Sequence, residues 1–166
     1  TATVIPEEYE GLGLTYLELS VIAEELGRAL APIPFSSSVY LATEAILAAG
    51  SEEQKQAYLP GLAAGTSIGC FALGESAGQT SASSLTTKAD GSSITGVKIP
   101  VADGDIANFA IVVATSNKGD GASLYIVDLD QDGVSRESIT TIDPSRSHAK
   151  LTLNAANAEL LGEDGR

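Results

Sequence analysis

A loop rich in glycine and hydroxyl side chains, residues 74–81, is the stretch of this sequence best suited to holding a ligand. It reads Gly-Glu-Ser-Ala-Gly-Gln-Thr-Ser, follows one segment of strand character and precedes another. Backbone amides in such a loop can turn toward an anion, and the hydroxyls add further donors. A phosphate group or the edge of a flavin ring would fit these donors. An ordinary polar loop explains the same composition equally well.

A second candidate is acidic. Asp128, Asp130, Asp132 and Gly133 match the first half of an EF-hand calcium loop. The match then fails, because Ile139 stands where the loop needs a bidentate glutamate and the flanks have strand character. A solvated turn between strands is the preferred interpretation. A small acidic module that binds calcium is the alternative outside any enzyme class.

The sequence gives little support for a catalytic nucleophile, a zinc site or a dinucleotide-binding site. His148 and Cys70 are the single histidine and cysteine, too few to complete a four-ligand zinc site. No nucleophile-elbow pattern accompanies the many serines. Residues 11–13, Gly-Leu-Gly, lack both a preceding strand and the third glycine of a dinucleotide-binding fingerprint. We therefore expect no metal site.

The overall charge excludes several classes of partner. Lys and Arg number 9 against 22 Asp and Glu, which gives a net charge of −13. Such a surface repels the phosphates of nucleic acids and of anionic membranes. No apolar run approaches the ~20 residues that a membrane-spanning helix needs. The lone Cys70 cannot form an internal disulfide, which favours a reducing compartment such as the cytoplasm.

The pattern of the chain changes near Thr66. Before this point apolar residues recur with helical spacing, and after it short β-branched runs alternate with turns. The sequence therefore predicts an α+β chain, with a helical segment over residues 1–66 and a β-domain over residues 67–166. The chain has no methionine and ends in what reads as an opening loop, so we expect a piece of a longer protein.

Local signals predict the helix ends. Thr15 and Ser51 each open a capping box, with Glu or Gln three residues later. A further helix is expected over residues 37–49, stopped by a glycine. Pro60 is expected to interrupt the last helix and Gly65 to end it.

Turn signals predict the strand pairing of the second part. Asp-Gly pairs at residues 90–91 and 120–121 are typical of tight hairpins. Short strands joined at this spacing predict an antiparallel β-barrel-like domain or a sandwich. The strands are expected over residues 68–73, 85–89, 94–101, 109–115, 124–127, 134–138 and 150–153.

The ordered set of segments resembles the acyl-CoA dehydrogenase family, over nearly the whole chain. Single segments are weak signals, whereas the ordered set is specific. That family has a helical N-terminal domain, a middle β-domain and a C-terminal four-helix domain, so this chain resembles most of the first and all of the second, with the C-terminal domain absent. The segments that carry the resemblance are residues 4–13, 24–28, 50–55, 58–60, Phe71-Ala72-Leu73, Gly96, Lys98, 143–146 (Asp-Pro-Ser-Arg) and 160–162.

The resemblance implies an FAD-dependent oxidoreductase of fatty-acid and lipid metabolism that oxidises acyl-CoA thioesters between Cα and Cβ. FAD would lie between the β-domain and the C-terminal helices, and the helix after Pro34 would line part of the acyl pocket. A glutamate of the C-terminal domain would remove the α-proton, so no residue of this chain is assigned as catalytic. A homo- or hetero-oligomer and an electron-transfer partner are implied as well.

The resemblance also implies a set of flavin contacts. The family loop Thr-Glu-Pro-Gly-Ala-Gly-Ser-Asp corresponds to residues 74–81, and the family strand Trp-x-Thr-Asn-Gly corresponds to residues 100–104. Thr80 is implied to contact substrate as well as flavin. The implied cofactor-binding positions are Phe71, Leu73, Gly74, Gln79, Thr80, Pro100, Val101 and Ala102.

Three of these positions depart from the family pattern. Gly74 replaces a threonine at the pyrimidine edge of the flavin, Pro100 removes an aromatic wall, and Ala102 removes a hydroxyl at the N5 side. Main-chain contacts do not depend on the side chain, whereas each lost hydroxyl bond is worth ~0.5–1.5 kcal/mol. Two hypotheses stay open: a divergent dehydrogenase that keeps FAD, and a flavin-poor, non-catalytic partner subunit of a heteromeric dehydrogenase.

Overall fold

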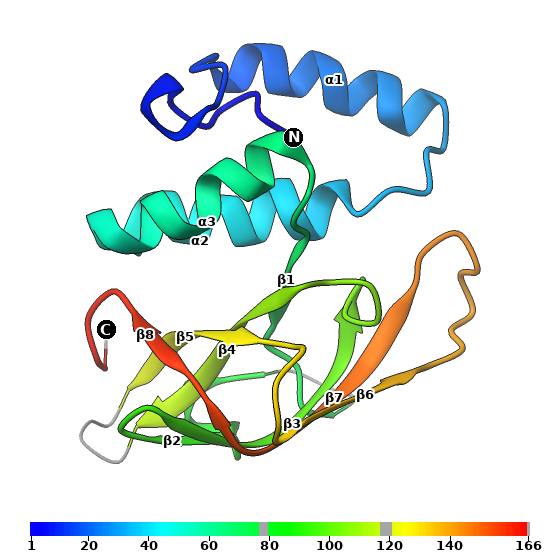
Figure 1. Cartoon of the computed structure of the whole chain (residues 1–166). Helices are drawn as coiled ribbons and strands as arrows, with labels where there is room; N and C mark the ends of the chain where they lie inside the picture. Colours follow the sequence, from blue (N-terminus) through cyan, green and yellow to red (C-terminus); the bar gives the residue numbers. More distant parts are fainter. Residues whose placement is uncertain (77–79, 117–120, 166) are drawn as a thin grey trace.

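The computed structural model describes residues 1–76, 80–116 and 121–165. It stacks a helical layer on a layer of β-strands, so the predicted α+β class is confirmed (Figure 1). Helix α1 (Tyr16–Arg28) lies farthest from the strands, and α3 (Glu52–Ala64) lies between α1 and the sheet. Within the described ranges, no helix combines the length and the apolarity needed to cross a bilayer.

Both predicted capping boxes are present. The Thr15 hydroxyl accepts from the amide of Leu17 and the Glu18 carboxylate accepts from the amide of Thr15, which fixes the start of α1. Ser51 and Gln54 make the same reciprocal pair at the start of α3. These bonds satisfy amides that the first helical turn otherwise leaves without partners.

The prediction that Pro60 interrupts the last helix is wrong. Helix α3 continues through Pro60 and ends at Gly65, whose φ of 71° is left-handed, as predicted for the helix end. A proline inside a helix costs roughly 3 kcal/mol. Leu59 and Leu62 flank the proline and are fully buried against the sheet, and this packing offsets the cost.

The helix predicted over residues 37–49 forms, but its first part is a π-helix. Segment η2 (Ser36–Thr43) has the wider π geometry and runs directly into α2 (Glu44–Ala49). The Thr43 hydroxyl donates to the carbonyl of Ser38, five residues earlier, at 2.8 Å. Segment η1 (Glu7–Tyr9) completes the helical layer in the described part of the chain.

The strands form one sheet, in the order β6-β7-β3-β2-β4-β5-β8, with β1 paired to β4. Both predicted hairpins form: β2 pairs β3, and β4 pairs β5, although the turn at residues 117–120 lies outside the described residues. The strand bounds are β1 Gly69–Ala72, β2 Lys88–Asp90, β3 Ser93–Ala102, β4 Phe109–Ser116, β5 Ala122–Asp128, β6 Val134–Ser138, β7 His148–Asn157 and β8 Glu159–Leu161.

The prediction of an antiparallel, barrel-like domain needs correction, because the sheet is mostly antiparallel and is not a closed barrel. Strands β6 and β8 end the strand order and do not pair with each other among the described residues, so the sheet is open. Both β1 and β2 run parallel to β4. Helices cover the face of β4 and β5 that this open sheet would otherwise expose: Leu59 and Ile46 pack with Ile111 and Ile126.

Strand β4 belongs to two hydrophobic cores. Ala110 and Val112 point into a core inside the β-layer, whereas Phe109 and Ile111 point into a core shared with the helices. Alternate side chains of a strand face opposite sides of its sheet. This explains why the run from Phe109 is continuously apolar instead of alternating with polar residues.

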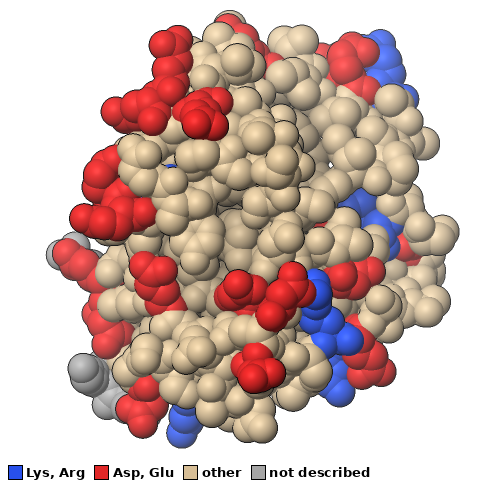
Figure 2. Space-filling view, in the orientation of Figure 1, with Lys and Arg blue, Asp and Glu red and all other residues tan. Residues whose placement is uncertain are grey.

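Charge is distributed over the outside of this fold. Other residues make up most of the visible face, and among its charged side chains Asp and Glu predominate over Lys and Arg (Figure 2). The surface seen there agrees with the net charge of −13.

A glycine sets the distance between η2 and β1. A Cβ atom on Gly69 would lie 2.5 Å from the Ala42 Cβ atom and 2.7 Å from the Phe109 ring. We expect Gly69→Ala to lower the free energy of unfolding by ~1–3 kcal/mol, because neither neighbour can retreat from a packed core. Gly27→Ala in α1 is the matched control: its Cβ atom meets nothing within 4 Å, and alanine favours a helix by up to ~1 kcal/mol. Urea unfolding of both variants checks this, and equal stability of the two would contradict it.

Candidate functional site

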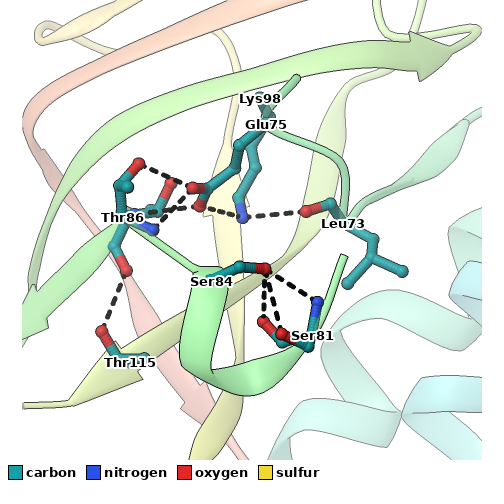
Figure 3. Close-up of polar contacts among 8 residues, drawn as sticks. Leu73, Glu75, Ser81, Ser84, Thr86, Lys98 and Thr115 are labelled. Atoms are coloured by element: carbon teal, nitrogen blue, oxygen red, sulfur yellow. Dashed lines mark hydrogen bonds and ion pairs between the residues drawn. The ribbon is translucent and has the colours of Figure 1, made fainter. Parts of the chain in front are cut away.

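The two segments predicted to contact a flavin lie against each other. The amide of Ile99 donates to the carbonyl of Gly74 at 2.8 Å, and the Lys98 ammonium donates to the carbonyl of Leu73 at 3.1 Å. The loop that leaves β1 is thereby fastened to β3 just before Pro100 (Figure 3 shows the Lys98 contact). Residues about 25 positions apart in the sequence thus form one surface.

Gly74 permits this close approach. A Cβ atom at this position would lie 3.0 Å from the carbonyl oxygen of Ile99. Any larger residue would have to push the strand or the loop away by a few tenths of an ångström. The glycine therefore allows the two backbones to lie close together.

A buried ion pair between Glu75 and Lys98 holds the loop after β1 against β3. Lys98 Nζ lies 2.8 Å from the Glu75 carboxylate, and the Lys98 side chain is fully buried. Glu75 also accepts from the amide and hydroxyl of Thr86, both at 2.6 Å, and from the amide of Thr87 at 2.9 Å (Figure 3). One carboxylate therefore joins the loop after β1, the segment before β2, and β3.

The pKa values follow from this arrangement. Burial raises the pKa of Glu75, but the hydrogen bonds from Lys98, Thr86 and Thr87 outweigh it and hold the pKa far below its usual range. Burial lowers the pKa of Lys98, and the contact with Glu75 offsets part of that shift. At neutral pH the site therefore holds a carboxylate beside an ammonium.

The predicted contact residues divide by exposure. Phe71 is half-buried and packs against the core shared with the helices, whereas Val101 is fully buried in the β-layer and can offer only main-chain atoms to a ligand. Leu73 and Pro100 are exposed, and Ala102 is half-buried on the same side of β3 as Pro100. The accessible side chains of this surface, Leu73, Pro100 and Ala102, are thus all apolar.

The remaining part of the loop is only partly described. Thr80 is half-buried and precedes η3 (Ala82–Ser84), whereas Gln79 lies outside the described residues. The hydroxyls of Ser81 and Ser84 lie 3.2 Å apart, and the Ser81 amide donates to the Ser84 hydroxyl (Figure 3). This serine turn leads from the loop into the segment that Glu75 holds.

The acidic segment forms a turn. The Asp128 carboxylate accepts from the amide of Asp130, and the Asp130 carboxylate pairs with Arg136. No three His, Cys, Asp or Glu side chains converge as a metal site in the parts of the chain that the structure describes. The segment is therefore a hydrogen-bonded turn between β5 and β6.

Sequence reasoning missed a second buried polar cluster. Asp103 follows directly on Ala102, is 3% exposed, and contacts both Ser37 and Arg146. The one local signal was an aspartate beside Gly104 at the end of an apolar strand. Its partners lie 66 and 43 residues away, so spacing alone could not have found them.

The Glu75–Lys98 pair predicts a response to substitution. We expect Glu75→Gln to lower the free energy of unfolding by ~3–5 kcal/mol, because it leaves the Lys98 charge buried without a counter-ion. The double variant Glu75→Gln/Lys98→Met should recover much of this loss, since no buried charge remains. Urea unfolding at neutral pH measures both variants, and a single variant as stable as the wild type would contradict the expectation.

The same pair predicts a pH dependence. The folded pKa of Glu75 lies below that of the unfolded chain, so its contribution is complete above the unfolded value of ~4.3 and is lost as pH falls below it. The double variant should therefore lose less stability on acidification than the wild type. Parallel acid unfolding curves for the two proteins would refute this.

Comparison with known proteins places these features in a family. The model described as "Acyl-CoA dehydrogenase, N-terminal domain" matches residues 1–66. The mitochondrial short-chain specific acyl-CoA dehydrogenase of Homo sapiens is 34% identical over 141 residues, which cover 78% of this chain and 34% of that protein. The chain therefore spans about a third of the length of this curated relative.

Solved structures share the fold. An acyl-CoA dehydrogenase complexed with FAD from Bacillus anthracis superposes with a TM-score of 0.89 at 31% identity, over 99% of this chain and 30% of that one. The ChsE4-ChsE5 complex from Mycobacterium tuberculosis gives a TM-score of 0.83 at 27% identity, over 97% of this chain and 44% of that one. Sequence matches along most of the chain and the shared arrangement of helices and strands show that the chain belongs to the acyl-CoA dehydrogenase family.

Proposed function

We propose that the protein containing this chain is an FAD-dependent dehydrogenase that oxidises acyl-CoA thioesters between Cα and Cβ. The observation that carries the proposal is the junction between the loop after β1 and the end of β3, where the carbonyl of Gly74 accepts from the amide of Ile99. FAD, when bound, supplies the acceptor for the hydride. The FAD complex of the Bacillus anthracis relative supports the choice of cofactor.

The residues of this chain would bind and orient the flavin. Leu73 and Pro100 would offer apolar surface, and Thr80 would offer a hydroxyl to flavin and substrate. Main-chain groups of Phe71, Gly74 and Val101 would supply contacts that do not depend on side chains. The contact of Gln79 remains a prediction, as does the role of every residue in this set.

The chemistry also needs groups outside this chain. We assign the helical domain to residues 1–66 and the middle β-domain to residues 67–166, with η2 beside the acyl group. The base that removes the α-proton would belong to a part of the protein outside residues 1–166, which cover about a third of the human relative. We therefore assign no catalytic residue here.

A non-catalytic partner subunit is the second candidate. Gly74, Pro100 and Ala102 each lack a side chain that the family turns toward the flavin. A structural neighbour of this chain is a complex of two differently named proteins, ChsE4 and ChsE5. Such a subunit would bind little flavin alone and would support activity only within a hetero-oligomer.

Three further expectations accompany the proposal. An oligomer, of like or unlike subunits, and an electron-transfer partner would be needed for turnover, and one neighbouring structure is titled an electron transferring flavoprotein. Location in a reducing compartment such as the cytoplasm stays a prediction from the lone and fully buried Cys70.

A flavin spectrum of the full-length protein tests the two candidates. We expect the protein purified with FAD to absorb near ~450 nm and to bleach when acyl-CoA is added, because the bound flavin is then reduced. A colourless protein that gains activity only with a second subunit would instead establish the partner role. Bound flavin that no acyl-CoA reduces would overturn the proposed reaction.

Restoring a lost hydroxyl tests whether the flavin lies at the end of β3. Ala102→Thr should tighten FAD binding by ~2- to 12-fold, which corresponds to one hydrogen bond of ~0.5–1.5 kcal/mol. Ala102→Val is the matched control, with the same shape and no hydroxyl. Titration of the apoprotein with FAD measures both variants, and equal affinities would place the flavin elsewhere.

Restoring the threonine hydroxyl at Gly74 should have a different effect on FAD binding. Gly74→Thr adds a Cβ atom 3.0 Å from the carbonyl of Ile99, so we expect the new hydroxyl to bring no gain in FAD affinity. A gain equal to that of Ala102→Thr would show that the two backbones move apart without cost.

A further inference from the structure

A buried carboxylate lies immediately beyond the proposed flavin-contacting strand. Asp103 follows Ala102, and its side chain is 5% exposed. One oxygen, Oδ2, accepts from the Ser37 hydroxyl at 2.5 Å and from Arg146 Nη2 at 2.7 Å. The other oxygen, Oδ1, accepts from the Ser147 hydroxyl at 3.4 Å. The carboxylate is therefore fully engaged inside the protein.

These partners come from three separate segments. Ser37 belongs to η2 in the helical layer, Asp103 to the end of β3, and Arg146 to the loop that enters β7. Arg146 reaches η2 as well, since its Nη1 donates to the Ser36 hydroxyl at 2.9 Å. One ion pair thus joins the first turn of η2 to the strand that carries Pro100 and Ala102.

The backbone fixes the direction of the carboxylate. Asp103 has a φ of 56°, in the left-handed region that aspartate and asparagine tolerate better than most residues. Its amide donates to the carbonyl of Ser147 at 3.0 Å, and its carbonyl accepts from the amide of Ala107 at 3.0 Å. The turn is therefore held on both sides, and the side chain can reach η2 without moving the strand.

In the described part of the chain, Asp103 is the carboxylate that forms an ion pair with Arg146, while Asp143 interacts with the same charge from farther away. The Arg146 Nε is buried and has no hydrogen-bond partner among the residues that the structure describes. Removing one member of a buried ion pair leaves the other charge without compensation. Asp103 is consequently the group that keeps Arg146, and with it the Ser36 contact, in place.

We infer that Asp103 is a positioning residue that couples η2 to the end of β3. The inference rests on the proposed function, which assigns η2 to the acyl side of the site and residues 100–102 to the flavin side. The carboxylate holds both in one arrangement, so a shift of the helix is transmitted to the flavin-contacting strand. Its role is exerted through Ala102 and Ser37 and not by contact with the reacting atoms.

Neutralising the carboxylate tests this coupling in the full-length holoprotein. Asp103→Asn keeps the size of the side chain and tolerates the left-handed backbone, so it removes mainly the charge. We expect its Kd for FAD to rise about tenfold, because the end of β3 is then no longer held in the arrangement that binds the flavin. Asp105→Asn is the matched control, in the same turn and bonded to Ser138 rather than to η2; its Kd should stay within about twofold of the wild type.

A milder variant covers the case in which Asp103→Asn does not fold. Ser37→Ala removes the hydroxyl bond of η2 and leaves the Asp103–Arg146 pair intact. Hydrogen–deuterium exchange should then speed up both in η2 and at the amides of Val101 and Ala102, but not in α3. Faster exchange confined to η2, or an unchanged Kd for FAD in a folded Asp103→Asn variant, would overturn the coupling.

Hydrogen–deuterium exchange distinguishes a failure of the proposed function from a failure of the coupling through Asp103. A wild-type protein that binds no FAD would defeat the proposed function, while exchange in η2 and at the amides of Val101 and Ala102 would still report the mechanical link. A flavin-binding wild type without linked exchange would defeat the coupling alone.

Discussion

The double burial of β4 is the constraint on which the rest of the structure depends. A strand that must be apolar on both faces needs one core on each side, and this chain supplies the helical layer on one face and the remaining strands on the other. Because β1 pairs with β4 in parallel, the chain leaves β1 at the same end at which β4 leaves the sheet. Because β3 runs antiparallel to β2, and β2 runs parallel to β4, the segment that leaves β1 runs in the opposite direction to β3 and contacts it at Lys98 and Ile99, beside the candidate site.

Two ion pairs then fix the orientation of segments that the apolar cores do not fix. Hydrophobic packing is not directional, so it sets the layers but not the angle of a loop. Glu75 with Lys98 fastens the loop after β1, and Asp103 with Arg146 fastens the end of β3. Both pairs flank the surface formed by Leu73, Pro100 and Ala102. Polar contacts are thus placed where orientation matters, and apolar contacts where only burial matters.

The features that sequence reasoning found are those with local causes. Thr15 and Ser51 cap helices through partners within three residues, and the Asp-Gly turn at residues 90–91 needs only its own backbone. The features it missed have distant causes. The helix continues through Pro60 because the sheet packs on both its neighbours, and β8 exists because β5 offers it an edge. The same distinction holds for the candidate site. The flavin-contact positions were predicted from the order of segments along the chain, whereas the partners of Asp103 lie too far away in the sequence to be paired by spacing.

The buried lysine bears on the choice between a flavin enzyme and a flavin-poor subunit. A fully buried ion pair is a poor way to gain stability, since well-packed apolar residues of the same size often serve as well or better. Lys98 donates one hydrogen bond to Glu75 and one to the carbonyl of Leu73, which belongs to the surface proposed for the ring. The pair is more easily explained as a means of holding Leu73 and Gly74 in one orientation than as a source of stability. In the proposed site, the three positions that differ from the family pattern affect side-chain contacts, whereas main-chain contacts to a flavin would depend only on the orientation of the backbone. We therefore place the proposal of a divergent flavin site before that of a flavin-poor subunit.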